Sequence, residues 1–100
     1  MSICRDLEFR FSTGEVESVR ISIETPCPAN EPDMWWCAYS IGGTTINRSF
    51  RLAGIDSVQA LTLVLATMPA ELERIEKSLQ GRFWFLGELG HLFSEVRTQV

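Results

Sequence analysis

The sequence is poor in the residues that most catalytic, metal and nucleic-acid sites require. It contains one histidine, three cysteines and fewer basic than acidic side chains, nine against thirteen, for a formal net charge of −4. This balance argues against a nucleic-acid groove or an anionic membrane surface as the main partner. No apolar run reaches the roughly 18 residues that a membrane-spanning helix needs. We therefore expect a protein that binds neither nucleic acid nor membrane.

The cysteine pattern excludes the common metal and disulfide frameworks. Cys4, Cys27 and Cys37 are 23 and 10 residues apart, which matches no zinc-finger spacing, and three thiols cannot all pair with one another. The first six residues lack the basic stretch and apolar core of a secretory signal. These features predict a cytoplasmic protein with reduced thiols and no metal or other cofactor. We expect Cys37 to fill a small space in the core.

A catalytic constellation is also missing. The single histidine, His91, would reach the exposed-looking Cys27 only if the C-terminal region folded onto the loop that carries this thiol. Gly42-Gly43 lies in a hairpin pattern rather than between a strand and a helix, so it does not form a phosphate-binding loop. Five carboxylates lie on faces that we expect to be solvated: Asp6, Glu8, Glu71, Glu73 and Glu76. We therefore predict that the chain is not an enzyme.

The sequence does contain strong secondary-structure patterns within a single expected domain, residues 1–100. Residues 4–11 and 16–24 alternate between apolar and polar side chains, which predicts two half-buried strands. A three-residue loop between them pairs Leu7 with Val19 and so places both apolar faces on the same side. Gly14 suits the left-handed position that such a loop requires.

A second hairpin follows a proline-rich loop. Residues 25–33 hold three of the four prolines, which predicts a loop. Residues 34–41 and 44–52 are expected to form strands joined by the two-residue turn Gly42-Gly43. This turn pairs Ile41 with Thr44, Tyr39 with Ile46, Cys37 with Arg48 and Trp35 with Phe50. Arg48 then lies on the apolar face, where it needs either a carboxylate or a place at the rim of the sheet.

Residues 56–80 carry the strongest helix signal in the chain. Asp56 is a good N-cap, Gln59 can complete a capping box, and Gln80-Gly81 can end the helix. Pro69 lies in the middle and predicts a kink within one helix, because the apolar stripe keeps its phase across it. That stripe consists of Val58, Leu61, Leu65, Met68, Leu72, Ile75 and Leu79, and Ala60 and Val64 widen it.

These elements predict an α+β fold. Four antiparallel strands form one sheet in the sequential order, and the long, Pro-kinked C-terminal helix packs on one of its faces. An aromatic tail, residues 82–100, follows the helix. Within the tail, residues 91–98 are compatible with either a short strand or a helical turn.

The aromatic side chains supply the candidate interaction surface. Trp35, Tyr39 and Phe50 are expected in the core under the helix. The Trp36 side chain points to the polar face of the sheet, where the aromatic tail, of the same chain or of a dimer partner, is expected to cover it; left exposed, it would form a hot spot for a partner. The candidate surface comprises Trp36, Phe83, Trp84 and Phe85.

Two segments resemble a known family. The strand from Trp35 to Gly43 fits the pattern W-x-C-x-[YF]-x-I-x-G, and the segment from Gly54 to Leu61 fits G-[VI]-D-S-x-Q-A-L. Together they resemble a family of small, uncharacterised bacterial proteins, a domain of unknown function. The chain departs from the pattern at Ala38, where the family has a proline. The resemblance implies a bacterial, cytosolic protein with a sheet-plus-helix fold, and it implies no activity.

Three functions are compatible with these observations. The first is a protein-interaction or accessory module, for example of the immunity type, that acts by occupying the surface of an unknown partner protein. The second is a small-ligand binder with a pocket between sheet and helix, lined by Cys37, Tyr39 and Arg48. The third is an enzyme that uses Cys27 or a pair of carboxylates. We favour the first, and a homodimer is compatible with the first two.

Overall fold

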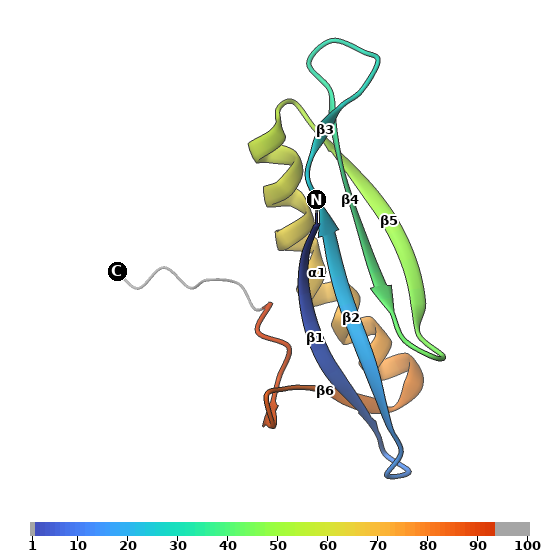
Figure 1. Cartoon of the computed structure of the whole chain (residues 1–100). Helices are drawn as coiled ribbons and strands as arrows, with labels where there is room; N and C mark the ends of the chain where they lie inside the picture. The colour runs from blue at the N-terminus through green and yellow to red at the C-terminus, as the bar shows by residue number, and fades with distance from the viewer. Residues whose placement is uncertain (1, 94–100) are drawn as a thin grey trace.

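The computed structural model describes residues 2–93. The strands are β1 (Ser2–Phe11), β2 (Val16–Glu24), β3 (Cys27–Pro28), β4 (Trp35–Gly42), β5 (Asn47–Gly54), β6 (Gly81–Phe85) and β7 (Glu88–Leu89), and the helix is α1 (Ser57–Leu79). The α+β prediction is confirmed. The prediction of four strands is wrong, because the described residues form one sheet of seven strands (Figure 1).

All neighbouring strands are antiparallel. From one edge to the other the sheet runs β5, β4, β2, β1, β6 and β7. Strand β5 pairs with β4 along its whole length, so β2 and the short β3 share the other side of β4. The sequential order predicted for the first four strands is therefore confirmed for β1, β2, β4 and β5. Strand β3 lies inside the expected proline-rich loop.

The first hairpin has the predicted register. Leu7 pairs with Val19, and the Phe11 amide donates to the Glu15 carbonyl at 2.8 Å. Gly14 has φ +98°, a left-handed conformation that costs glycine little. Loop length and hydrophobic pattern agree here, and together they determine the pairing.

The second hairpin has a different register from the one predicted. Tyr39 pairs with Phe50 and Ile41 pairs with Arg48, so β5 is displaced by four residues from the expected pairing. The shift is even, and the apolar side chains therefore stay on the expected face. The connection is a four-residue loop, residues 43–46, rather than a two-residue turn, and Ile46 is buried within it.

A buried carboxylate explains the longer loop. Glu17 Oε2 accepts hydrogen bonds from the amides of Thr45 and Ile46 at 2.8 and 3.1 Å, and Oε1 accepts one from the Thr45 hydroxyl at 2.6 Å. Burial alone would raise the pKa of Glu17, but these hydrogen bonds outweigh it and hold the pKa below its usual value. A carboxylate on β2 thus replaces the backbone pairing that a tight turn would have supplied.

The segment expected to be an aromatic tail is partly a strand. Strand β6 pairs with the end of β1, and Phe83 lies opposite Phe9 with ring centroids 4.9 Å apart. Gln80 ends the helix in the left-handed conformation and turns the chain back towards the sheet, as Figure 1 shows. Residues 91–93 are neither strand nor helix, and residues 94–98 of that prediction lie outside the described residues.

The helix begins as predicted and is continuous through Pro69. The Asp56 carboxylate accepts from the Gln59 amide at 2.7 Å, and the Gln59 side chain accepts in return from the Ile55 amide at 2.8 Å. This reciprocal arrangement satisfies two amide groups at the start of the helix. The kink at Pro69 stays a prediction.

The buried face of the helix is rotated relative to the predicted stripe. Its buried residues are Ala60, Val64, Met68, Glu71, Leu72 and Ile75. Val58 and Leu65, which we expected in the core, are 70% and 45% exposed. The cause is a close approach at Gly54, where an added Cβ would lie 2.5 Å from the Ala60 amide nitrogen. Because the backbones meet there, Ala60 is fully buried against the sheet, whereas Leu65 lies at the margin of the contact, where it lines a groove with Ile21 and Ile23 of β2.

Glu71 lies in the core-facing surface, so the expectation that it is solvated is wrong. Its carboxylate pairs with Arg48 at 3.2 Å and with Arg74 at 2.7 Å. Arg48 therefore has a carboxylate partner, and it lies opposite Ile41 rather than Cys37. A buried carboxylate held by two guanidinium groups avoids the cost of an unpaired charge.

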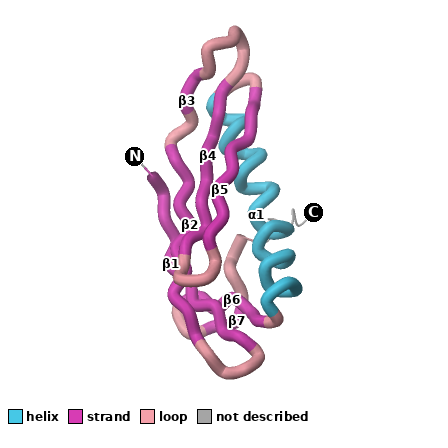
Figure 2. Tube along the Cα trace, turned by 90° about the vertical axis from the view of Figure 1, so that its right-hand side faces the viewer, coloured by secondary structure: helices cyan, strands magenta, loops and turns pink. Residues whose placement is uncertain are grey.

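The helix covers one face of the sheet, but not all of it. Its main contacts are with β5 and β4, and its end meets β6 (Figure 2). Cys37, Tyr39 and Ile41 are buried beneath it, which confirms Cys37 as a core residue. Trp35 is half-buried, and Phe50 is 46% exposed beside Tyr39. No helix in the described part of the chain combines the length and apolar character of a membrane span.

Replacing Glu17 with alanine tests the loop assignment. The variant leaves the Thr45 and Ile46 amides without their acceptor, so we expect a loss of about 2 kcal/mol of unfolding free energy at pH 7. Because the folded pKa of Glu17 is depressed, its contribution is present above pH 4.5 and is lost as the pH falls through the folded pKa. Urea unfolding at pH 7, and at a pH below the folded pKa of Glu17, measures the loss of unfolding free energy, and the exposed Glu15→Ala variant is the control. Equal losses in the two variants would contradict it.

Candidate protein-interaction site

The structure does not bring the four predicted surface residues together. Phe83 is fully buried in the core, and Phe85 faces the helix side of the sheet. Trp36 and Trp84 are half-buried on the opposite, polar face. Trp36 lies beside Cys27 at one end of β4, whereas Trp84 lies beside Glu8 on the other side of β1. The two indoles therefore do not form one patch.

Each of these tryptophans is covered by an arginine. The Arg51 guanidinium lies 3.9 Å from the ring centroid of Trp36, and Arg10 lies 4.0 Å from that of Trp84. Such cation–π contacts shield the rings from water. We expected the aromatic tail to cover Trp36, but the described part of the tail does not do so. Arg51, from the neighbouring strand β5, does so instead.

The other sites proposed from the sequence are also separated. Cys37 and Tyr39 are buried in the core, and Arg48 is paired with Glu71. Cys27 lies on β3, whereas His91 packs against Phe83 of β6. Among residues 2–93 no group of three histidine, cysteine or acidic side chains is placed to hold a metal ion.

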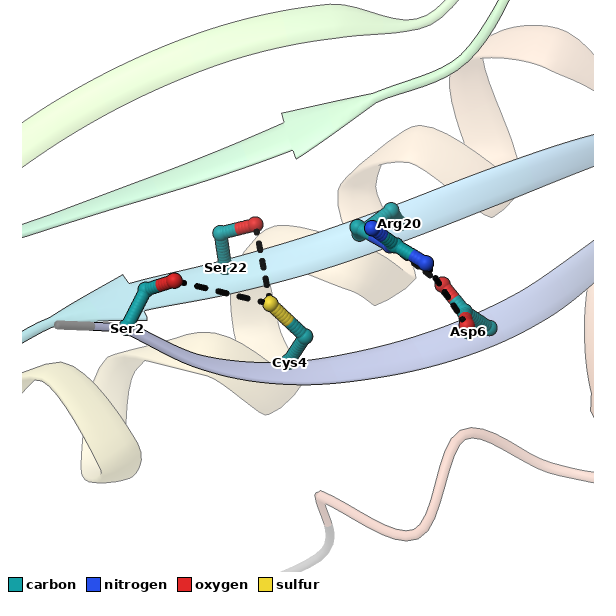
Figure 3. A network of polar contacts seen from close by, with 5 residues as sticks. All are labelled: Ser2, Cys4, Asp6, Arg20 and Ser22. Atoms are coloured by element: carbon teal, nitrogen blue, oxygen red, sulfur yellow. Dashed lines mark hydrogen bonds and ion pairs between the residues drawn. The ribbon is translucent and has the colours of Figure 1, made fainter.

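A polar network occupies the outer face of β1 and β2 (Figure 3). The Cys4 thiol lies 3.6 Å from the Ser22 hydroxyl and 3.7 Å from that of Ser2, and these hydrogen bonds lower the pKa of Cys4. The Asp6 carboxylate pairs with Arg20 at 2.7 Å, which lowers the pKa of Asp6. Ser22 is half-buried, and the other four residues are exposed. The network lines the outer face of one edge of the sheet.

That edge belongs to the first half of β1. Strand β6 pairs only with residues 8–11 of β1, and among the described residues no backbone hydrogen bond reaches the outer side of residues 2–7. We call this stretch the open edge. Unpaired backbone groups at a sheet edge form a ready template for another extended segment.

The residues whose backbone groups point outward can be identified. The Phe11 amide donates to the carbonyl of Glu15, the residue before β2, so the backbone groups of odd-numbered β1 residues face β2 and those of even-numbered residues face the other way. Pairing with β6 agrees, because the Phe83 amide opposite Phe9 points away from β1 and donates to Glu76 at 2.9 Å. Ser2, Cys4 and Asp6 therefore direct their amide and carbonyl groups out from the open edge.

An apolar groove of about 190 Å³ lies on the helix side of this edge. We call it the apolar groove; its lining is Ile3, Cys4, Arg5, Ile21, Ile23, Leu61, Leu65 and Phe93. Ile3 is 64% exposed, although it lies on the same face as the core residue Leu7. The groove exists because the rotated helix leaves this part of the sheet uncovered.

The end of the groove is formed by the segment that follows β7. Arg5 donates from Nη1 to the carbonyls of His91 and Leu92 at 3.2 and 3.0 Å, and its guanidinium stacks on Phe93 with 4.5 Å to the ring centroid. The buried His91 accepts through Nδ1 from the Phe93 amide at 3.0 Å. These contacts hold Phe93 against the groove.

The sequence carried only part of the signal for this site. The apolar stripe predicts Val58, Leu61 and Leu65 in the core, but only Leu61 packs against the core, and Val58 and Leu65 are exposed. The difference follows from the Gly54–Ala60 contact, which periodicity alone does not reveal. The open edge could not be foreseen at all, because it depends on where β6 stops pairing with β1.

The state of His91 gives a pH-dependent prediction. Burial lowers the pKa of His91 below 6.5, and Arg5 adds to this, whereas Glu76 and Glu73 oppose it. Because the folded pKa is depressed, the contribution of His91 to stability is present above pH 6.5 and is lost as the pH falls below it. In an NMR titration we expect the imidazole and the Phe93 amide to respond together, with a midpoint below 6.5. A midpoint at or above this value would contradict the buried, neutral His91.

Comparison with family models finds a match, whereas two other comparisons find none. No curated protein and no solved structure matches the chain. A family model described as a domain of unknown function, DUF6968, matches residues 3–94. This range contains both sequence motifs, residues 3–7 of the open edge and the residues of the apolar groove. The chain belongs to the DUF6968 family of domains of unknown function.

Proposed function

We propose that this domain is a non-catalytic protein-interaction module that binds an extended segment of a partner protein at the open edge of β1. The observation that carries the proposal is the juxtaposition of unpaired backbone groups with an apolar groove on the same strand. A segment added to a sheet edge gains affinity from main-chain hydrogen bonds and specificity from pockets for alternate side chains. The open edge offers the backbone groups for such hydrogen bonds, and the apolar groove offers a pocket for side chains.

The backbone supplies the first contribution. Ser2, Cys4 and Asp6 each offer an outward amide and an outward carbonyl, so an antiparallel segment can form hydrogen bonds at these three alternate positions. Their side chains lie on the outer face, among the Ser22 and Arg20 contacts, and do not block the edge (Figure 3). The edge contains no proline, which would remove a donor.

The apolar groove supplies the second contribution. Every second residue of an added segment would point to the helix side of the sheet, where Ile3 and Leu65 remain exposed by 64% and 45%. Covering this surface releases water from apolar groups, at about 25 cal/mol per Å². An alternating apolar and polar segment therefore matches the site better than a uniformly polar one.

A small apolar ligand is the second candidate. A groove of about 190 Å³ between sheet and helix can hold a small organic molecule, and its lining is largely aliphatic and aromatic. This candidate uses the groove but not the open edge. Protection of the Ser2, Cys4 and Asp6 amides on binding would distinguish a peptide from such a ligand.

The remaining features of the proposal rest on the sequence. They are an accessory or immunity-type role, a bacterial origin, a cytoplasmic location, and the absence of nucleic-acid and membrane partners. The acidic balance and the three free cysteines support a protein partner inside the cell. A homodimer, in which a second copy occupies the edge, is an alternative outcome of the tests below.

Leu65→Arg tests the proposed site. A displayed library of short peptides is selected on the full chain, and selected peptides are measured against the variant by titration calorimetry. We expect alternating apolar peptides and at least a tenfold loss of affinity for Leu65→Arg, because the substitution places a charge in the apolar groove.

Leu63→Arg is the matched control. Leu63 is 40% exposed, close to the value for Leu65, and lies about 200° away around the helix, outside the apolar groove. The Leu63→Arg variant should bind the peptides as the unmodified chain does. Equal binding by both variants, or peptides that leave the open-edge amides unprotected in hydrogen exchange, would rule out the proposed site.

A further inference from the structure

Arg5 occupies an unusual position in the proposed site. It lies on the same face of β1 as Ile3 and Leu7, between the apolar groove and the core, so a charged group points to the helix side of the sheet. Its guanidinium is flanked by two rings, with 5.0 Å to the centroid of Phe85 and 4.5 Å to that of Phe93. These rings orient the guanidinium and reduce its contact with water.

Arg5 lacks a carboxylate among the described residues. Arg10, Arg20, Arg48, Arg74 and Arg82 each have an acidic side chain within 4 Å, whereas residues 2–93 offer none to Arg5 or to Arg51, which stacks on Trp36. Its described hydrogen bonds use only Nη1, which donates to the carbonyls of His91 and Leu92. Nε and Nη2 have no described acceptor, and together they form the edge of a guanidinium that binds a carboxylate in bidentate fashion.

Strand geometry relates Arg5 to a bound segment. Ser2, Cys4 and Asp6 would form the hydrogen-bonded pairs, so Arg5 and Ile3 occupy the non-hydrogen-bonded positions, where side chains on paired strands lie closest. The residues opposite them point to the helix side as well. In an antiparallel segment, the residue opposite Arg5 comes first and the residue opposite Ile3 follows two positions later.

We propose that the open edge selects an antiparallel segment carrying an acidic residue opposite Arg5 and an apolar residue two positions later, opposite Ile3 and facing the apolar groove. The inference rests on the proposed function and names the chemistry of its partner: a peptide with the pattern acidic, any residue, apolar. The acidic side chain pairs with the free edge of the Arg5 guanidinium. The apolar side chain enters the groove beside Leu61 and Leu65.

The same residue argues against a second copy of the chain as the occupant. Pairing two β1 strands about Cys4 would place Arg5 opposite Ile3 of the other copy, and pairing them about Arg5 would place the two guanidinium groups opposite each other. Neither arrangement supplies a carboxylate, and the second adds a repulsion between like charges. An inward-pointing charge on an edge strand is a known device against self-association.

Three synthetic peptides test this inference. They share an alternating apolar sequence and differ only at the position opposite Arg5, which is glutamate, glutamine or lysine. For the full chain we expect the glutamate peptide to bind about tenfold more tightly than the glutamine peptide, and the lysine peptide to bind most weakly. The preference should shrink as salt concentration rises.

Charge reversal identifies Arg5 as the source of the preference. In Arg5→Glu the order should invert, so that the lysine peptide binds most tightly, and in Arg5→Gln the three peptides should bind alike. Arg20→Gln is the control, because Arg20 lies on the outer face and pairs with Asp6; it should retain the preference for glutamate.

The outcomes separate this inference from the proposed function. If the alternating peptides bind equally whatever residue lies opposite Arg5, the acidic preference is wrong and strand addition stands. If none of them binds, or if they bind without protecting the amides of Cys4 and Asp6, the proposed function itself fails. A concentration-dependent dimer in light scattering that the glutamate peptide does not dissociate would show that a second copy occupies the edge, and would also overturn the inference. If an Arg5 variant does not fold, the three peptides measured on the unmodified chain are sufficient to test the acidic preference.

Discussion

The contact between Gly54 and Ala60 determines how the helix meets the sheet. A side chain at Gly54 would lie 2.5 Å from the backbone of Ala60, so these two positions bring α1 against the end of β5. The helix consequently buries Ala60, Val64 and Met68 over β4 and β5, and its Leu61 and Leu65 side faces the uncovered part of β1 and β2. The apolar groove is therefore a consequence of helix orientation. The motif from Gly54 to Leu61 joins this contact to the Asp56 and Gln59 cap, which explains why these residue types occur together.

Much of the fold could be predicted because local patterns and pairing rules agreed. The first hairpin is correct in register, since the loop through Gly14 and the alternation around Leu7 and Val19 lead to the same pairing. The second hairpin failed because Glu17, distant in sequence, binds the Thr45 and Ile46 amides and stabilises a longer loop. Strand β6 was missed for a similar reason. The Gln80-Gly81 signal predicts where the helix ends, but it does not predict that the left-handed turn at Gln80 brings the following residues back to pair with β1.

The candidate site was the least predictable part. The sequence directed attention to Trp36, Phe83, Trp84 and Phe85, because exposed aromatic residues mark interaction surfaces. The structure buries Phe83 and stacks arginines on both tryptophans. An open edge is a property of strand pairing in three dimensions and has no composition of its own. What the sequence could have indicated is the surplus of apolar residues on the first half of α1, where Val58, Leu61 and Leu65 exceed what one core-facing stripe needs.

Arg5 links the stability of the domain to its proposed recognition. Its Nη1 binds the carbonyls of His91 and Leu92 and so holds Phe93 at the end of the apolar groove. The same guanidinium keeps its other edge available to a carboxylate and opposes pairing between two copies of β1. A neutral side chain at this position would weaken the attachment of the C-terminal segment and leave an apolar edge without protection against self-association. One arginine can therefore meet three requirements of an exposed strand: it anchors the segment that closes the groove, discourages the wrong partner, and selects the right one.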